Sequence, residues 1–245
     1  MSEQQGDFAS GYSISIYALS EKAVTVVFGH VISETLWRLV SSFNRLLTQN
    51  PFAGLTTTVP AYSTLTVFFN PLLVASADLP GKTCYEKVAG YLKEISHRAP
   101  DQTRLAGNHI VIPVCYGGNF GPDILTVAQN NGLSEAEVIA LHSGASYRVY
   151  MIGFVPGFAY MGGMPPTLAT PRKQVPAAAI PAGSVGIAGL QTGIYPIEIP
   201  GGWQIIGQTP LQLFDAKRQQ PALLKGGDSI TFKAITIDEF NAYWV

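Results

Sequence analysis

Among the residues of this sequence that could transfer a proton, His142 is the natural candidate. An unperturbed imidazole titrates near neutral pH, which suits general acid–base catalysis. The neighbouring Ser143 carries a hydroxyl that could hydrogen-bond a substrate. The competing interpretation is structural, because a histidine in the last turn of a helix interacts favourably with the helix dipole.

Arg172 and Lys173 are the candidate anion-binding residues. Residues 153–202 contain only three charged side chains, which are these two cations and Glu198. In so apolar a segment, a guanidinium could bind a phosphate or carboxylate and stabilise charge that develops during a reaction. We therefore assign a catalytic role to Arg172 and a binding role to Lys173. A solvated pair on a surface turn is the alternative.

Apolar loops supply further candidates. The stretch GFVPGFAYMGGMPP, residues 153–166, combines aromatic, glycine and proline residues with no charge. Glycine and proline favour tight turns, which would let backbone N–H groups and the faces of Phe158 and Tyr160 approach a small ligand. Packing of the loop against its own core is the competing interpretation.

A second stretch, QTGIYPIEIPGGW over residues 191–203, carries amide, hydroxyl and indole groups that could orient a ligand amide and carboxylate. The predicted binding side chains in it are Gln191, Thr192, Tyr195 and Trp203. Trp203 fits a core position equally well.

Other chemical signatures are incomplete. The stretch SADLPGKT, residues 76–83, resembles a phosphate-binding loop, but Ser76 replaces the first glycine and Pro80 has no N–H group. The four histidines never occur as a close pair, so we predict no metal site. Cys84 and Cys115 are not spaced as a zinc or redox motif, which favours free thiols.

The elements that must position these residues fall into two regions. Residues 1–99 are predicted to form a small α+β domain. Strand-like patterns cover residues 12–28 and 62–70, Ser33 can cap one amphipathic helix, and Thr83 can open another. A polar segment with Pro and Gly, residues 99–109, marks the boundary.

Residues 100–245 are predicted to form a mainly-β domain. HIVIPVCY and SYRVYMIGF have strand patterns, and the short strands at regular spacing after them suggest a barrel or sandwich. Between those two strands, Asp123 is expected to cap a short helix. Ser134 and Glu137 match a capping box for a second helix that reaches His142.

Composition restricts the class of protein. The chain has 245 residues, of which 47% are hydrophobic and 13% charged, so it can bury a large core. A formal net charge of −1 argues against nucleic acid or an anionic membrane as partner. The N-terminal sequence lacks the basic region of a secretory signal, and no apolar stretch reaches about 20 residues, so we expect a cytoplasmic protein.

Several long motifs carry a resemblance to a known family. They are IPVCYGGNFGPDI, EVIALHS, YMIGFVPGFAYMGGMP, ATPRKQVP, IPAGSVGIAGLQTGIYPIEIPGGWQIIGQTPLQLFD and GGDSITF. In this order they resemble the family of allophanate hydrolase subunit 1 domains, which includes the B-type subunit of bacterial 5-oxoprolinase and the sporulation-kinase inhibitor of bacilli. The resemblance is dense over residues 110–232 and loose before residue 100.

The resemblance implies a cyclophilin-like β-barrel for the C-terminal domain, preceded by a small α+β domain. It also implies a heteromeric complex with a related, C-like subunit and a third, A-like lactam-utilisation subunit. Such a complex opens the lactam of 5-oxoproline to glutamate with ATP hydrolysis. ATP, with Mg²⁺, would be bound by the complex, and the isolated chain would be inactive.

Two alternatives stay open from the sequence. One is an inhibitor that binds a sensor histidine kinase through the apolar loops. The other is a subunit of a related ATP-dependent urea or allophanate enzyme. One departure bears on the substrate: the family usually has a second Pro-Arg pair where this chain has Pro176 and Ala177. The missing guanidinium leaves Arg172 to act alone or indicates a shifted substrate.

Overall fold

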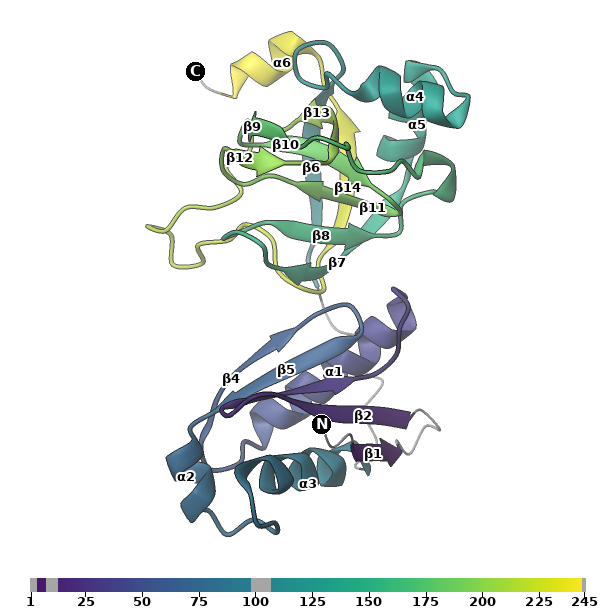
Figure 1. The fold of residues 1–245 in the computed structure, drawn as a ribbon. Helices are drawn as coiled ribbons and strands as arrows, with labels where there is room; N and C mark the ends of the chain where they lie inside the picture. Colours follow the sequence, from purple (N-terminus) through teal and green to yellow (C-terminus); the bar gives the residue numbers. More distant parts are fainter. Residues whose placement is uncertain (1–3, 8–12, 98–106, 244–245) are drawn as a thin grey trace. The chain divides into compact units, whose positions relative to one another are not determined.

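The computed structural model describes residues 4–7, 13–97 and 107–243. The chain divides into two compact units, residues 1–105 and 106–245, and each is described by itself (Figure 1). The domain boundary predicted between residues 99 and 100 lies outside the described residues.

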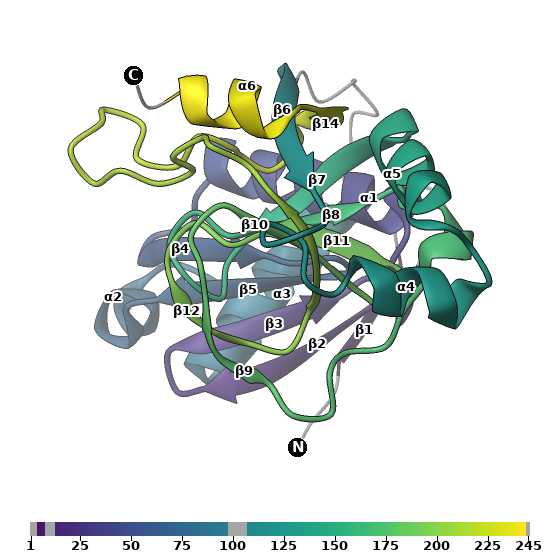
Figure 2. The same cartoon turned by 90° about the horizontal axis from the view of Figure 1, so that it is seen from above.

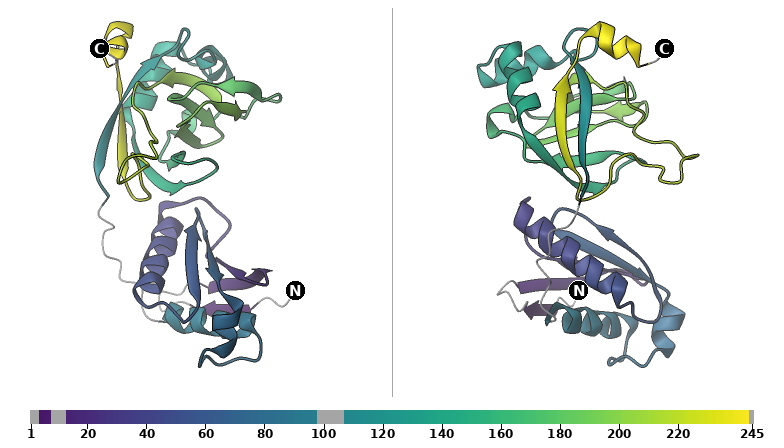
Figure 3. Two further views of the ribbon diagram at one scale, coloured as in Figure 1. Left: turned by 90° about the vertical axis from the view of Figure 1, so that its left-hand side faces the viewer. Right: turned by 180° about the vertical axis from the view of Figure 1, so that it is seen from behind.

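The first unit is a five-stranded antiparallel sheet with helices packed on one face. The strands, in the sheet order β1-β2-β3-β5-β4, are β1 (Gln4–Asp7), β2 (Ser13–Ser20), β3 (Ala23–Val27), β5 (Thr64–Phe69) and β4 (Leu55–Pro60). The helices are α1 (Glu34–Gln49), α2 (Pro71–Ser76) and α3 (Cys84–His97). Figure 3 shows α1 lying along a face of this sheet.

Local sequence explains where these helices begin. Ser33 is the N-cap of α1 as predicted, and its side chain accepts a hydrogen bond from the Leu36 N–H group. Thr83 precedes α3, and its hydroxyl accepts from the Glu86 N–H group at 3.1 Å. Both helices then bury an apolar face in one core with alternate residues of the central strands.

The second unit contains a closed β-barrel of seven strands, which confirms the predicted barrel. In barrel order the strands are β10 (Ser184–Ala188), β11 (Gln191–Ile194), β8 (Ala159–Gly162), β7 (Ser146–Ile152), β14 (Ser229–Ala234), β6 (His109–Tyr116) and β13 (Gln204–Gln208). The pairing of β6 with β14 is parallel, and these strands run side by side in Figure 3. The other barrel pairs are antiparallel.

Short elements complete this unit. They are α4 (Ile124–Asn131), α5 (Glu135–Gly144), the 3-10 helix η1 (Pro166–Leu168), α6 (Ile237–Ala242) and a two-stranded sheet of β9 (Ala177–Ile180) and β12 (Ile199–Gly201). Figure 2 shows α4 and α5 side by side. The capping box predicted at Ser134 and Glu137 is present on α5. Asp123 occupies the N-cap position of α4 as predicted, but its side chain makes no capping hydrogen bond.

The barrel wall separates two apolar clusters. The inner cluster takes buried residues from all seven strands, such as Met161 of β8 and Ile194 of β11. The outer cluster lies on the opposite face of β8, β10, β11 and β13, and β9 supplies Ile180 to it. Side chains alternate along each strand, so Ala159 and Met161 point inward and Tyr160 points outward.

Candidate functional site

Four predicted site residues meet on the outer face of the barrel. The ring centroid of Phe158 lies 4.7 Å from that of Tyr160, 5.2 Å from that of Tyr195 and 5.5 Å from that of Trp203. Phe158, Tyr195 and Trp203 are buried, whereas Tyr160 is half-buried. Phe158 therefore forms the centre of the cluster, and Tyr160 lies closer to solvent. We call these four residues the outer aromatic cluster.

Gly193 of β11 makes room for two of these rings. A Cβ atom at Gly193 would lie 2.9 Å from Cζ of Phe158 and 3.0 Å from Cζ3 of Trp203. Such distances are shorter than van der Waals contact, so a larger residue would displace the rings. The absence of a side chain at this position therefore lets both rings pack directly on the strand.

The turn that leads to Phe158 holds an aromatic residue that sequence reasoning missed. Phe154 has φ +68° and is 62% exposed, and its ring meets Phe158 edge-on at 5.7 Å. The Val155 N–H group donates to the Gly153 carbonyl at 2.8 Å, which closes a γ-turn around Phe154. A positive φ in a γ-turn is strained for a residue with a side chain. The periodicity of hydrophobic residues, which predicts helices and strands, does not indicate such a turn.

Arg172 places a positive charge against the same cluster. Its guanidinium carbon lies 5.9 Å from the ring centroid of Trp203, as in a cation–π contact. No carboxylate in residues 107–243 forms an ion pair with it. Burial raises the pKa of the Tyr160 phenol, and the nearby Arg172 charge opposes that rise. The exposed guanidinium is therefore available to an anion.

Lys173 is engaged differently from the prediction. Its Nζ forms an ion pair with Oδ2 of Asp123 at 2.7 Å, and both side chains are largely covered. The same Asp123 oxygen accepts a hydrogen bond from the Ile205 N–H group at 2.7 Å. The Asp123 carboxylate thus neutralises Lys173 and ties its loop to β13.

His142 and Thr192 lie on the other side of the barrel wall from the outer aromatic cluster. Both are fully buried. The imidazole Nδ1 lies 2.8 Å from the Tyr116 hydroxyl, and Nε2 lies 3.0 Å from Oγ1 of Thr192. Burial lowers the pKa of His142 to about 3, so the ring is neutral at pH 7. Proton transfer by His142 stays a prediction, and the geometry does not bring it to a ligand at the outer cluster.

Two further predicted positions are set by strand geometry. Gln191 begins β11 and pairs with Ala188, four residues before Tyr195, or about 13 Å along an extended strand. It is nevertheless only two residues from Gly193, on which the rings of Phe158 and Trp203 pack, and its partner Ala188 is buried in the outer cluster. Ala177, where the second arginine was expected, packs against that cluster, so the missing guanidinium would have adjoined the same site.

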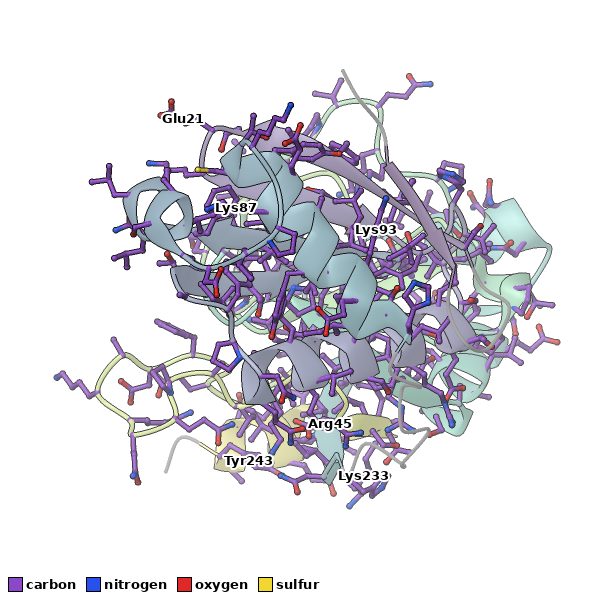
Figure 4. All side chains as sticks on the ribbon, turned by 90° about the horizontal axis from the view of Figure 1, so that it is seen from below. Glu21, Arg45, Lys87, Lys93, Lys233 and Tyr243 are labelled. Atoms are coloured by element: carbon purple, nitrogen blue, oxygen red, sulfur yellow. The ribbon has the colours of Figure 1, made fainter. Side chains whose placement is uncertain are left out.

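The phosphate-loop resemblance does not fit a phosphate. The N–H groups of Lys82 and Thr83 donate to Oε2 of Glu86 at 2.7 and 3.1 Å, so a carboxylate occupies the donors that a phosphate would need. The nearby Lys87, which lies in α3 outside this stretch and is labelled in Figure 4, donates to the carbonyls of Ala75 and Ala77, each at 2.8 Å. This loop therefore does not provide a nucleotide site.

Metal ligands are scattered rather than grouped in the part of the chain that the structure describes. In residues 4–7, 13–97 and 107–243, no three His, Cys, Asp or Glu side chains are grouped as a metal site requires. Cys84 and Cys115 are free thiols. Within the same ranges, none of the helices has both the length and the apolar character of a membrane span. The cytoplasmic location stays a prediction.

Known proteins resemble this chain over most of its length. Residues 14–224 match the family described as carboxyltransferase domain, subdomain C and D. The B-type subunit of 5-oxoprolinase from Bacillus subtilis is 42% identical over 233 residues, which cover 93% of this chain and 95% of that protein.

Two further relatives agree with this match. The B-type subunit of 5-oxoprolinase from Escherichia coli O157:H7 is 55% identical over 123 residues, which cover 50% of this chain and 56% of that protein. The crystal structure of a conserved uncharacterized protein from Pyrococcus horikoshii is 47% identical, with a TM-score of 0.54, and covers 92% of this chain and 99% of that one.

Proposed function

Because this chain belongs to the family of carboxyltransferase domains, subdomain C and D, we propose that it is the B-type subunit of an ATP-dependent 5-oxoprolinase complex. The observation that carries the proposal is the alignment with the B-type 5-oxoprolinase subunit of Bacillus subtilis over nearly the whole of both chains. The partners in the complex would be a C-like and an A-like subunit. We further propose that the barrel is cyclophilin-like.

The outer aromatic cluster suits 5-oxoproline chemically. This substrate is a small five-membered lactam ring that carries one carboxylate. The exposed Arg172 guanidinium can bind the carboxylate through two parallel hydrogen bonds. The exposed Phe154 ring and the half-buried Tyr160 ring can cover the apolar carbons of the lactam. The binding contacts that we assign are therefore Phe154, Tyr160 and Arg172.

The reaction adds water across the lactam C–N bond, so the carbonyl carbon gains an oxygen and the nitrogen becomes the amine of glutamate. Negative charge develops on the carbonyl oxygen during this step. In this chain, Arg172 would fix the substrate carboxylate and so hold the ring in one orientation. The imidazole of His142 is not assigned a step, because it is buried behind the barrel wall.

The nucleotide is assigned to the rest of the complex. The loop over residues 76–83 turns its N–H groups to Glu86, and Lys173 is neutralised by Asp123. Arg172 is thus the remaining predicted anion-binding cation, and a single guanidinium does not match a triphosphate with its metal. We expect ATP and Mg²⁺ to bind on the partner subunits.

The test is turnover by the assembled complex. This chain is co-expressed with the A-like and C-like subunits, and glutamate release and ADP formation are measured with 5-oxoproline. Arg172→Ala should lower kcat/KM by about 10- to 100-fold, the usual contribution of a charge-assisted hydrogen bond. Arg172→Lys keeps the charge but not the bidentate geometry, so its kcat/KM should lie between those of the wild type and Arg172→Ala.

The matched control is Arg38→Lys, because Arg38 is an exposed arginine of α1 paired with Glu34, far in sequence from the outer aromatic cluster. It should retain the full activity. A correctly assembled complex that never turns over 5-oxoproline would overturn the proposal. Inhibition of a sensor histidine kinase, or turnover of urea or allophanate, would then identify which alternative holds.

A further inference from the structure

We infer that His142 is a positioning residue: a neutral imidazole, protonated on Nε2, whose hydrogen bond to Thr192 fixes the strands beneath the outer aromatic cluster. Thr192 lies on β11 with its hydroxyl inside the barrel. The hydroxyl also donates to the Gly186 carbonyl of β10 at 3.1 Å. A side chain from α5 therefore reaches two neighbouring strands through one hydroxyl group.

Counting donors assigns the tautomer. The Thr192 hydroxyl has one proton, and the Gly186 carbonyl can only accept it, so Oγ1 must accept from His142. Nε2 therefore carries the imidazole proton. Nδ1 is then an acceptor, and the Tyr116 hydroxyl donates to it. The opposite tautomer would leave the Tyr116 proton without an acceptor among the described residues.

The surroundings of the imidazole favour this neutral form. The ring stacks on Phe232 with centroids 4.5 Å apart and lies 5.3 Å from the ring of Tyr147. The Tyr147 hydroxyl donates to the backbone carbonyl of His142 at 2.8 Å. The titratable groups that face His142 are thus the phenols of Tyr116 and Tyr147, and burial raises the pKa of both.

The link to the outer aromatic cluster runs through two glycines. Gly186 and Gly193 are directly paired across β10 and β11. A Cβ atom at Gly186 would lie 3.1 Å from Cβ of Trp203, and one at Gly193 would lie 3.0 Å from Cζ3 of the same ring. The strand segments that Thr192 joins are therefore the surface on which Trp203 rests. A shift of either strand would move the ring that Arg172 contacts.

The first test is independent of the proposed function. Imidazole nitrogens of the full chain are observed by ¹⁵N NMR at pH 7, and the His142 signals are identified by their loss in His142→Gln. We expect a protonated Nε2 and an unprotonated Nδ1, with slow exchange of the N–H proton. A proton on Nδ1, or an imidazolium at pH 7, would overturn the inference.

The second test separates the two hydrogen bonds. His142→Gln can keep a donor at the position of Nε2 and so retain the bond to Thr192. His142→Asn can keep an acceptor near Nδ1 but loses the bond to Thr192. The Trp203 indole N–H signal should shift in His142→Asn and in Thr192→Val, which lose the bond. It should change little in His142→Gln and in Thr192→Ser, which can keep it.

Kinetics of the assembled complex extend this test, and they rest on the proposed function. A displaced Trp203 should weaken substrate binding, so Thr192→Val should raise KM for 5-oxoproline about 10-fold with little change in kcat. Thr192→Ser should restore KM to within about threefold. A large fall in kcat in His142→Gln, with the Trp203 signal unmoved, would assign a catalytic role to the imidazole and contradict the inference.

Discussion

The two faces of the barrel wall use the same strands in opposite ways. On the inside, the proton of each hydroxyl and imidazole group in the Tyr116–His142–Thr192 chain has an acceptor, the chain is neutral, and His142 and Thr192 are fully buried. On the outside, a cation without a carboxylate partner in residues 107–243 and an exposed, strained aromatic residue border a tight ring cluster.

This difference indicates which face can bind a ligand. A buried network in which every hydrogen-bonding group has a partner stabilises one arrangement of strands and leaves no group to bind a ligand. An exposed guanidinium on an aromatic face retains unused capacity for hydrogen bonds. We therefore place the ligand outside the wall and the support for its binding surface inside.

The largest expected effect is a loss of unfolding free energy in acid, which would come from protonation of His142, a residue of the inner network, on unfolding. The folded chain holds His142 with a pKa of about 3, whereas the unfolded chain would protonate near 6.5. As the pH falls below 6.5, the unfolded state gains a proton that the folded state does not bind. The free energy of unfolding should therefore drop by up to about 1.4 kcal/mol per pH unit from this group alone.

Urea unfolding followed through the amide signals of the barrel strands measures this effect in the wild type and in His142→Gln. Carboxylates titrate in both proteins and cancel in the comparison. The phenols of Tyr116 and Tyr147 are neutral throughout this range, since a phenol ordinarily titrates near pH 10 and burial raises the pKa of both further. Identical pH slopes for the two proteins would contradict the assigned state of His142.

The next largest effect disturbs the wall from the outer side. Gly193→Ala places a methyl group against the rings of Phe158 and Trp203, so the variant should lose about 1–3 kcal/mol of unfolding free energy and bind 5-oxoproline more weakly. Gly144→Ala is the control, since no atom outside its chain neighbours and its own helix backbone lies within 4 Å of the added Cβ among the described residues. Chemical denaturation measures the unfolding free energy of both variants. Equal losses in Gly193→Ala and Gly144→Ala would show that the methyl group does not disturb the two rings.

A smaller effect isolates strain in the turn at Phe154. Phe154→Gly and Phe154→Ala both remove the ring, but only glycine adopts φ +68° without penalty. The glycine variant should be about 1 kcal/mol more stable than the alanine variant, while both raise KM to a similar extent. Thermal unfolding and kinetics of the two complexes measure these quantities. An alanine variant as stable as the glycine variant would mean that the turn is unstrained.

The smallest effect is expected for the Lys173–Asp123 ion pair. Unlike Arg172, Lys173 has a carboxylate partner within the described residues, so its removal should affect stability more than ligand binding. A double-mutant cycle of Asp123→Asn and Lys173→Met should give a coupling of about 1 kcal/mol that weakens with added salt. Ligand affinity should change little in the single variants. A loss of affinity in Lys173→Met as large as in Arg172→Ala would return Lys173 to the binding residues.

Local signals in the sequence predicted local structure well. The capping box at Ser134 and the caps at Ser33 and Thr83 depend on residues within one turn, so their spacing identifies them. The short strands at regular spacing suggested a barrel or a sandwich, and the family resemblance implied the barrel. The aromatic residues predicted as part of a site lie together; they are Phe158, Tyr160, Tyr195 and Trp203.

What the sequence did not reveal was the side of the wall on which each residue lies. His142 and Thr192 belong to segments 50 residues apart, and their meeting depends on strand register. Thr192 and Gly193 are adjacent in the chain, yet one lines the interior and the other supports Trp203. The Asp123–Lys173 pair likewise joins two distant loops, so the local sequence around Asp123 indicated only a helix cap.

The most direct test compares the two faces in one experiment. The pH dependence of kcat/KM for 5-oxoproline is measured for assembled complexes in which this chain is wild type, Arg172→Ala or His142→Gln. We predict that Arg172→Ala lowers kcat/KM at every pH by about 10- to 100-fold, whereas His142→Gln keeps the wild-type profile. Two results together would contradict the account: kcat/KM unchanged in Arg172→Ala, and a pH profile that loses one ionisation in His142→Gln. They would place the chemistry inside the barrel.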